Sequence, residues 1–492
     1  SAIASGETEA IARDWEAMRP YVPAAFREIA MPLNRPRILF IVCLGVLIAQ
    51  LDTSVVNLAA RSIGADLRAG VGALQWVLDA YNLAYACLLL TGGTLGDLYG
   101  RRRVFLLGIL LFAAGSLLCG LAPGVAVLIT GRALTGLGAA LALPSSLAII
   151  ADVFPAGRER SRAIGVWASC NGIALAVGPT AGGVLLELAG WRSIFLVVVP
   201  VAALAVAMGL RDLPESAAPE GRRLDLPGQT LAIAALGLLS LAVIEGPRWG
   251  WGAASTIGCG IAGVLALALF LSAQARGRAP MVPLGLFRSA PFSAAMLIAA
   301  LMTFGIYAML FLLPIYLQAV RGIGVVWAGL AMLPMALAFV TLSRRSGALA
   351  SEWGARAVMA AGMACMAGGL LGLALVGRAT PFWAVELFAL VVGAGLGLNG
   401  GPVMAVAVAS APAERSGTAS GLGNTARMVG ATLGVAVLGA VFASHAGQGA
   451  SDVSGVLAGF RLAMLGSAAS ACAGCLVTLA LIDRRALLAR AG

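Results

Sequence analysis

The sequence contains no lysine, and all 33 residues in the Lys+Arg total are arginines. A Walker-A phosphate loop needs a lysine on the phosphates, and Schiff-base cofactors need a lysine amine. A standard P-loop ATPase and a pyridoxal- or retinal-dependent protein are therefore excluded. Histidine occurs once, at His445, which excludes a site built from several histidines. Any work that this protein does is expected to draw on an ion gradient.

Charge is also scarce, because only 11% of the 492 residues are charged whereas 60% are apolar. Soluble domains carry about 25% charged residues. A water-soluble globule of this composition would expose too much apolar surface, so the sequence predicts an integral membrane protein. The eight cysteines lie almost entirely in apolar segments. Cys472 and Cys475 form C-x-x-C within such a segment, where helix packing explains them better than a metal or redox role.

Runs of about 20 apolar residues predict membrane-spanning helices. Fourteen such runs are found, at residues 38–60, 73–96, 103–121, 125–150, 161–187, 192–210, 229–246, 253–273, 291–317, 326–343, 357–376, 382–410, 416–443 and 459–482. Residues 1–37 form a polar leader without the apolar core of a signal peptide. Residues 211–228 form a proline-rich linker, and residues 483–492 form a polar tail.

The arginines orient this arrangement. With the N-terminus placed inside, 24 arginines fall in cytoplasmic segments, seven fall in outer segments, and Arg132 and Arg427 lie within the membrane. Positively charged residues favour the cytoplasmic side, so both termini are expected in the cytoplasm. The same rule accounts for the net charge of +11 without a nucleic-acid partner.

An internal repeat relates the two ends of the chain. The loop Gly93–Arg102 and the segment Gly347–Arg356 share a glycine-to-glycine spacing of seven residues and a glycine-to-arginine spacing of nine. The two loops are 254 residues apart, which maps the first predicted helix onto the ninth. Because the helix offset is even, the repeats are parallel. The sequence thus predicts an all-α polytopic protein of 6+2+6 helices. The predicted bundles are residues 38–210 and 291–482, joined through residues 211–290.

Four motifs carry a resemblance to a known family. They are Leu51-Asp-Thr-Ser-Val-Val-Asn-Leu-Ala59, the loop Gly93-Thr-Leu-Gly-Asp-Leu-Tyr-Gly-Arg-Arg-Arg103, Arg132-Ala-Leu-Thr-Gly-Leu-Gly-Ala-Ala140 and Gly178-Pro-Thr-Ala-Gly-Gly183. Together with the helix plan, they resemble the major facilitator superfamily, and more closely its fourteen-helix drug:proton antiporters. Ala60-Arg61 replaces the usual Leu-Pro end of the first motif, and Thr135 replaces a common glutamine. No departure removes a charged residue.

The resemblance implies proton-coupled efflux of small amphipathic drugs or toxic compounds across the bacterial inner membrane by alternating access. Its expected partners are a small-molecule substrate, protons and membrane lipids, with no cofactor, and the protein is expected to be a monomer. The two inserted helices are expected to pack at the side, away from the transport path. The main alternative is a dedicated exporter of one endogenous metabolite. A non-transporting sensor or a membrane enzyme is the other alternative, although the lone histidine and missing lysine disfavour an enzyme.

Three ionisable residues in the N-terminal half are candidates for proton coupling. Asp52, Arg132 and Asp79 lie roughly 12, 10 and 9 Å from the outer ends of their predicted helices, taking 1.5 Å per residue. A charge in a spanning helix costs about 2.5–3.5 kcal/mol on insertion scales, so it marks a candidate functional site. Burial disfavours an ionised carboxylate and a neighbouring guanidinium favours it, so protonation of Asp52 would release Arg132. A fixed interhelical ion pair, with Asp79 hydrated near the outer mouth, is the structural alternative.

Five residues are candidates for the substrate cavity. Arg427 lies within a predicted helix, and Asn171 occupies the equivalent position 256 residues earlier. Tyr307 aligns with Thr53 in the repeat, next to Asp52. Asn399 and Glu386 add polar groups on the twelfth predicted helix. Two alternatives to a cavity role remain open. In the first, Arg427 packs against backbone carbonyls, and in the second, Glu386 is only an interfacial carboxylate.

The other two motifs predict conformational roles. By resemblance, the gating loop consists of Gly93, Asp97, Gly100, Arg101 and Arg102, where broken contacts would let the two halves rock. Topology alone would explain the arginines of this loop but not its glycines and Asp97. The antiporter motif consists of Gly178, Pro179, Gly182 and Gly183. Small residues allow close helix approach and proline removes a backbone hydrogen bond, so this segment is expected to seal or bend a helix at the domain interface, with generic packing as the alternative.

Overall fold

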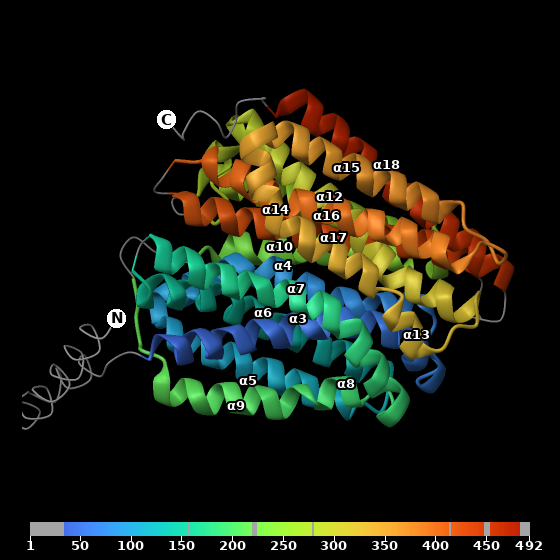
Figure 1. The fold of residues 1–492 in the computed structure, drawn as a ribbon, viewed down its shortest axis with the longest axis horizontal. Helices are drawn as coiled ribbons and strands as arrows, with labels where there is room; N and C mark the ends of the chain where they lie inside the picture. Colours follow the sequence, from blue (N-terminus) through green and yellow to red (C-terminus); the bar gives the residue numbers. More distant parts are fainter. Residues whose placement is uncertain are drawn as a thin grey trace, which may run out of the picture.

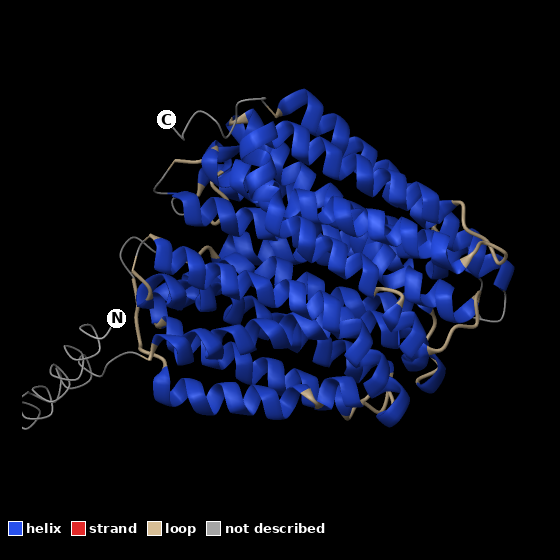
Figure 2. Ribbon diagram, viewed as in Figure 1, coloured by secondary structure: helices blue, strands red, loops and turns tan. Residues whose placement is uncertain are grey.

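The computed structural model describes residues 34–155, 157–218, 224–277, 280–412, 415–446 and 453–482. On the fifth predicted helix, the side chains at positions 158, 161, 171, 172, 175 and 176 lie outside this description. All regular structure in the described ranges is helical (Figure 2).

The N-terminal half comprises α3 (Arg35–Asp66), α4 (Val71–Tyr99), α5 (Arg101–Gly120), α6 (Val125–Val153), α7 (Arg158–Ala189), α8 (Ser193–Leu196) and α9 (Val198–Asp212). The inserted pair is α10 (Leu226–Trp249) and α11 (Ala254–Arg276). A short 3-10 helix η2 (Leu284–Arg288) leads to α12 (Ala290–Ala319), α13 (Val325–Leu330), α14 (Leu333–Trp353), α15 (Ala355–Ala374), α16 (Phe382–Ala409), α17 (Ser416–Ala446) and α18 (Val453–Leu481).

Thirteen spans in the described chain are long and apolar enough to cross a membrane, with α8–α9 and α13–α14 each counted as one span. The 32-residue α7 lies at the position of the remaining predicted span and is not among the thirteen. Each of the fourteen apolar runs overlaps one helix or two consecutive helices.

Backbone capping explains where several of these helices begin. The Asn34 side chain accepts a hydrogen bond from the backbone N–H of Arg37, which caps α3. Gly100 ends α4 and starts α5 with φ of 107°, and Gly354 ends α14 and starts α15 with φ of 84°. Positive φ is a conformation that glycine adopts without steric cost. The two repeated loops thus share one backbone turn at equivalent positions.

The helices form two bundles that meet along a central seam (Figure 1). Across the seam α4 packs against α17, α7 packs against α13 and α14, and α3 packs against α12. The inserted α10 contacts both α4 and α17, so it bridges the two halves. The start of α3 and the end of α18 lie at the same end of the molecule (Figure 1).

Candidate functional site: a central cavity and a buried ion pair

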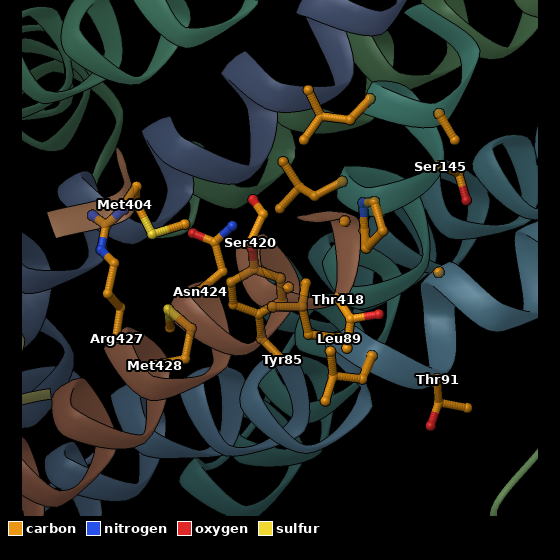
Figure 3. Close-up of a pocket in the computed structure, with 18 of the residues that line it drawn as sticks. Tyr85, Leu89, Thr91, Ser145, Met404, Thr418, Ser420, Asn424, Arg427 and Met428 are labelled. Carbon is orange, nitrogen blue, oxygen red and sulfur yellow. The ribbon is translucent and has the colours of Figure 1, made fainter. Parts of the chain in front are cut away.

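A cavity with a volume of about 1340 Å³ lies between the two bundles. Its wall includes residues of α3, α4 and α6 on one side and residues of α12, α16 and α17 on the other. Figure 3 shows part of this wall, with Tyr85 and Leu89 on α4 facing Asn424 and Arg427 on α17. The cavity reaches Asp97 and Arg101 at the end of α4 and the start of α5, so it opens at the end of the molecule where α3 begins and α18 ends.

The opposite end of the molecule is closed by contacts between the halves. The guanidinium of Arg61 donates to the carbonyl of Gln318 at 2.6 Å, and the Gln318 amide donates to the carbonyl of Leu58 at 3.3 Å. The Gln75 amide of α4 donates to the carbonyls of Val435 and Ala436 on α17 at 3.0 and 3.1 Å. Among the described residues, the cavity wall therefore reaches the end that holds Asp97 and Arg101, whereas the opposite end is closed by these contacts.

Asp52 and Arg132 form an ion pair inside the N-terminal bundle, in the layer that their depths predict. Asp52 is 4% exposed and Arg132 is 1% exposed. Arg132 also donates to the carbonyl of Val77 on α4 at 3.0 Å, and its guanidinium carbon lies 4.6 Å from the centre of the Tyr81 ring. Neither Asp52 nor Arg132 lines the cavity, but Thr53 and Tyr81 do. The pair is therefore separated from the cavity by a single layer of side chains.

Asp79 does not join this pair. It is fully buried, and within the described chain neither of its carboxylate oxygens accepts a hydrogen bond at 3.5 Å or less. The Asn82 side chain is its polar neighbour. Gln75 and Ala86, on the same face of α4, both contact α17, which places Asp79 at the seam between the halves. Full burial contradicts the alternative of a hydrated Asp79 near the outer mouth.

Two of the predicted cavity residues line the cavity. Tyr307 of α12 and Arg427 of α17 are both in its wall. Thr303 of α12 donates to the backbone carbonyl of Arg427 at 2.6 Å, which ties the two helices together next to the cavity. Asn171 lies on α7, and its side chain is outside the described part of the chain.

Asn399 and Glu386 do not line the cavity, which corrects the prediction for both residues. Asn399 is fully buried, donates to the carbonyl of Gly395, and lies close to Gly362 on α15. Glu386 is half-buried near the first turn of α16. Asn399 lies on the face of α16 that packs against α15. Glu386 lies about five turns before Met404 and therefore shares the face of that cavity residue, but it is at the other end of the helix, away from the cavity.

The inserted helices themselves stay outside the cavity wall, as predicted, because no described residue of α10 or α11 lines it. The segments that flank them do contribute, since Leu224 and Asp225, just before α10, and Pro280, Met281 and Pro283, after α11, line the open end of the cavity. Along the seam, α10 contacts both α4 and α17.

Several cavity residues were missed by the sequence analysis. No sequence pattern marked Tyr81 and Tyr85 as cavity residues, because aromatic residues are common in spanning helices. Ser420 and Asn424 lie on α17 together with Arg427 (Figure 3). Polar residues at positions 420, 424 and 427 share one face of a helix, so their spacing is a signal that predicts a polar stripe.

The gating loop is held within the N-terminal half. Arg101 pairs with Asp97 of α4 at 2.9 Å and with Asp152 of α6. The backbone N–H of Arg101 donates to Ser216, and that of Arg102 donates to the Glu215 carboxylate at 3.1 Å. In this conformation, the loop binds α4, α5, α6 and the segment that follows α9.

The Gly178–Gly183 motif lies where α7 meets both α3 and the opposite half. A Cβ added at Gly178 would lie 2.0 Å from the Ser54 hydroxyl of α3. A Cβ added at Gly329 of α13 would lie 2.2 Å from the carbonyl oxygen of Pro179, and one at Gly183 would lie 3.1 Å from Val326. Gly182 packs on Val55 of α3. Only small residues permit these backbone approaches.

Comparison with known proteins agrees with this architecture. The model of the Major Facilitator Superfamily matches residues 42–435. The chain is 40% identical over 415 residues to the multidrug resistance protein Stp of Mycobacterium tuberculosis, which covers 84% of this chain and 77% of that protein. It is 36% identical to the tetracenomycin C resistance and export protein of Streptomyces glaucescens, with 83% and 76% covered.

A solved structure gives the same fold. The bacterial homologue of the human lysosomal transporter Spinster, in an inward-facing and unoccupied conformation, superposes with a TM-score of 0.66 and 17% sequence identity. The match covers 94% of this chain and 98% of that chain. From the family match, the extent of the relatives' similarity and the two-bundle architecture, this multi-pass membrane protein belongs to the Major Facilitator Superfamily.

Proposed function

We propose that this protein exports small amphipathic drugs or toxic organic compounds across the bacterial inner membrane in exchange for protons, by alternating access. The observation that carries the proposal is the buried Asp52–Arg132 pair, one layer of side chains away from a cavity between two bundles. The names of the relatives, a multidrug resistance protein and a resistance and export protein, support an export role.

The arginine distribution supports the orientation. The open end of the cavity holds the segments counted as cytoplasmic, which carry 24 of the 33 arginines. On this assignment the cavity faces the cytoplasm and both termini are cytoplasmic. The proposed transport unit is a monomer, and the observation that supports this proposal is that one chain forms both the cavity and the ion pair.

The proposed cycle uses protonation of Asp52 as its switch. In the inward-facing conformation Asp52 is ionised and paired with Arg132. When the outer side opens, a proton from outside neutralises Asp52 and weakens the pair. The Arg132 guanidinium then stays bound to the Val77 carbonyl of α4 and loses its ionic contact with Asp52 of α3. Release of that proton to the cytoplasm restores the pair, and substrate leaves in the opposite direction. Asp79, a buried acid at the seam, is the second group that the proposal assigns to coupling.

Internal pH of proteoliposomes tests this proposal. Wild-type protein is expected to move protons when a transported compound is added, and Asp52→Asn is expected to abolish this movement because an amide cannot exchange a proton. Asp79→Asn, measured in the same assay, separates the contributions of the two acids. Proton movement by Asp52→Asn at the wild-type rate would refute Asp52 as the switch. No proton movement by wild type with any bound compound would refute antiport.

A further inference from the structure

The charged residues of the cavity wall fall into two groups. In the described wall, these residues are Asp97, Arg101, Asp225, Arg415 and Arg427. Asp97 and Arg101 neutralise one another at 2.9 Å. Asp225 caps α10, because its carboxylate accepts from the backbone of Gly228 at 2.8 Å and from Gln274 at 2.6 Å. Both acids of the wall are thus engaged in the protein's own structure.

The two remaining arginines differ in their position. Arg415 is exposed at the start of α17 and also borders a second, smaller cavity of about 370 Å³ at the mouth. Arg427 lies about three helical turns further along α17 and is only partly exposed. In the described part of the chain Arg427 forms no ion pair, and its Nε is buried without a hydrogen-bond partner. The deep cavity therefore holds a guanidinium that no described acid neutralises.

The surroundings of Arg427 are amphipathic. Tyr85 and Tyr307 lie close enough to interact electrostatically with it. Met428, next to it on α17, packs with Ala86 and Ala431, and Met404 of α16 is also in the wall (Figure 3). Methionine and tyrosine side chains accommodate apolar and aromatic bodies of varied shape. Asn424, one turn before Arg427, adds a hydrogen-bonding group.

The acids that would attract a cation are not in this wall. Asp52 is paired with Arg132 behind Thr53 and Tyr81, and Asp79 is sealed at the seam. A lipophilic cation in the deep cavity would meet Arg427 without a neighbouring described carboxylate. A carboxylate would form charge-assisted hydrogen bonds with the guanidinium and supply its missing partner.

We infer that the substrates are amphipathic organic anions whose carboxylate pairs with Arg427 while their apolar body packs on the tyrosines and methionines. This inference rests on the proposed export function for its physiological meaning, but the binding preference that it predicts exists without any gradient.

Equilibrium binding to purified protein in lipid nanodiscs tests the inference. The probes are anthracene-9-carboxylate, anthracene-9-carboxamide and 9-(aminomethyl)anthracene, which share one fluorescent body and differ in charge. Wild type is expected to bind the carboxylate about tenfold or more tightly than the amide, because the amide keeps one acceptor oxygen for the guanidinium but loses the negative charge and the second acceptor oxygen. The amine is expected to bind most weakly.

Arg427→Gln is expected to remove this preference, so that it binds the carboxylate and the amide within about twofold of one another, and retained binding of the amide shows that the variant is folded. Arg415→Gln is the matched control, because it removes an arginine from the mouth of the same cavity, and it should retain the wild-type preference. Equal binding of all three probes to wild type, tighter binding of the amine, or a carboxylate preference that survives in Arg427→Gln would overturn the inference.

The same probes in the proteoliposome assay separate this inference from antiport. Selective carboxylate binding without proton movement would reject antiport and leave the anion preference standing. Proton movement triggered by the amine but not by the carboxylate would support antiport and overturn the anion preference.

Discussion

Two intramembrane arginines, one in each half of the molecule, have opposite environments. Arg132 in the N-terminal half is 1% exposed and is held by Asp52, by the carbonyl of Val77 and by the face of Tyr81. Arg427 in the C-terminal half borders the cavity and has no ionic partner in the described chain. Arg132 is thus held inside its bundle, whereas Arg427 is accessible from the cavity, which is what the proposed switch and binding roles require. The comparison shows that the environment of an intramembrane charge depends on its neighbours as well as on its depth.

The largest expected difference is in stability. Arg132→Ala should lower the free energy of unfolding by about 3–5 kcal/mol, because it leaves the Asp52 carboxylate buried without its partner. Arg427→Ala should change it by less than about 1 kcal/mol, because the lost side chain has no ionic partner. Chemical unfolding in detergent, followed by tryptophan fluorescence, measures both values. Similar losses in the two variants would break the comparison.

A double variant is the control for Arg132. Asp52→Leu combined with Arg132→Leu removes both charges, so it should recover much of the stability lost in Arg132→Ala. It should not recover substrate-dependent proton movement, because no titratable group remains at the pair. Full recovery of proton movement would show that the pair is only structural.

The next effect concerns the closed end of the cavity, where α13 of the C-terminal half packs against α7 of the N-terminal half. In Gly329→Ala, the new Cβ would lie 2.2 Å from the Pro179 carbonyl oxygen, so α13 and α7 must move apart. Overpacking of this kind costs about 1–3 kcal/mol, which changes the ratio of inward- to outward-facing molecules by at least about fivefold. Distances between spin labels on the two halves measure this ratio.

Gly324→Ala is the matched control on the same short segment, because a Cβ there meets no atom within 4 Å. It should give the wild-type distance distribution. A wild-type distribution in Gly329→Ala as well would show that this contact does not hold the outer end closed.

The smallest effect is expected at Glu386, an intramembrane charge that belongs to neither environment. It does not line the cavity, and no ion pair to it is found among the described residues. Glu386→Gln should leave the rate of substrate efflux from cells within about twofold of wild type. A tenfold loss would reveal a third functional charge and would require a revision of the two-arginine comparison.

Residue depth was predicted well, and residue orientation was not. The positions of Asp52 and Arg132 along their helices indicate one common layer, and the structure pairs them. Asp79 lies at a similar predicted depth but points to the seam with α17. Depth follows from a constant rise per residue, whereas the direction of a side chain depends on how its helix is rotated against its neighbours.

The small-residue motifs show the same difference between what the sequence predicts and what it does not. The sequence predicts close helix approach at Gly178 and Gly183, but it does not identify the partners. The structure assigns Ser54 of α3 to the first and Val326 of α13 to the second. It also places α10 against both α4 and α17, although the apolar sequence of this inserted helix resembles that of any lipid-facing helix.

The sequence by itself determined that the chain spans the membrane many times, that its arginines gather on one side, and that an internal repeat relates two bundles. These properties follow from local hydrophobicity and from residue spacing, which need no knowledge of distant contacts. Only the tertiary structure decided that Asp52 neutralises Arg132, that Asp79 is sealed at the seam, and that Arg427 is left to face the cavity. Helix rotation and packing bring together residues up to hundreds of positions apart, and no local pattern encodes which of those side chains will meet.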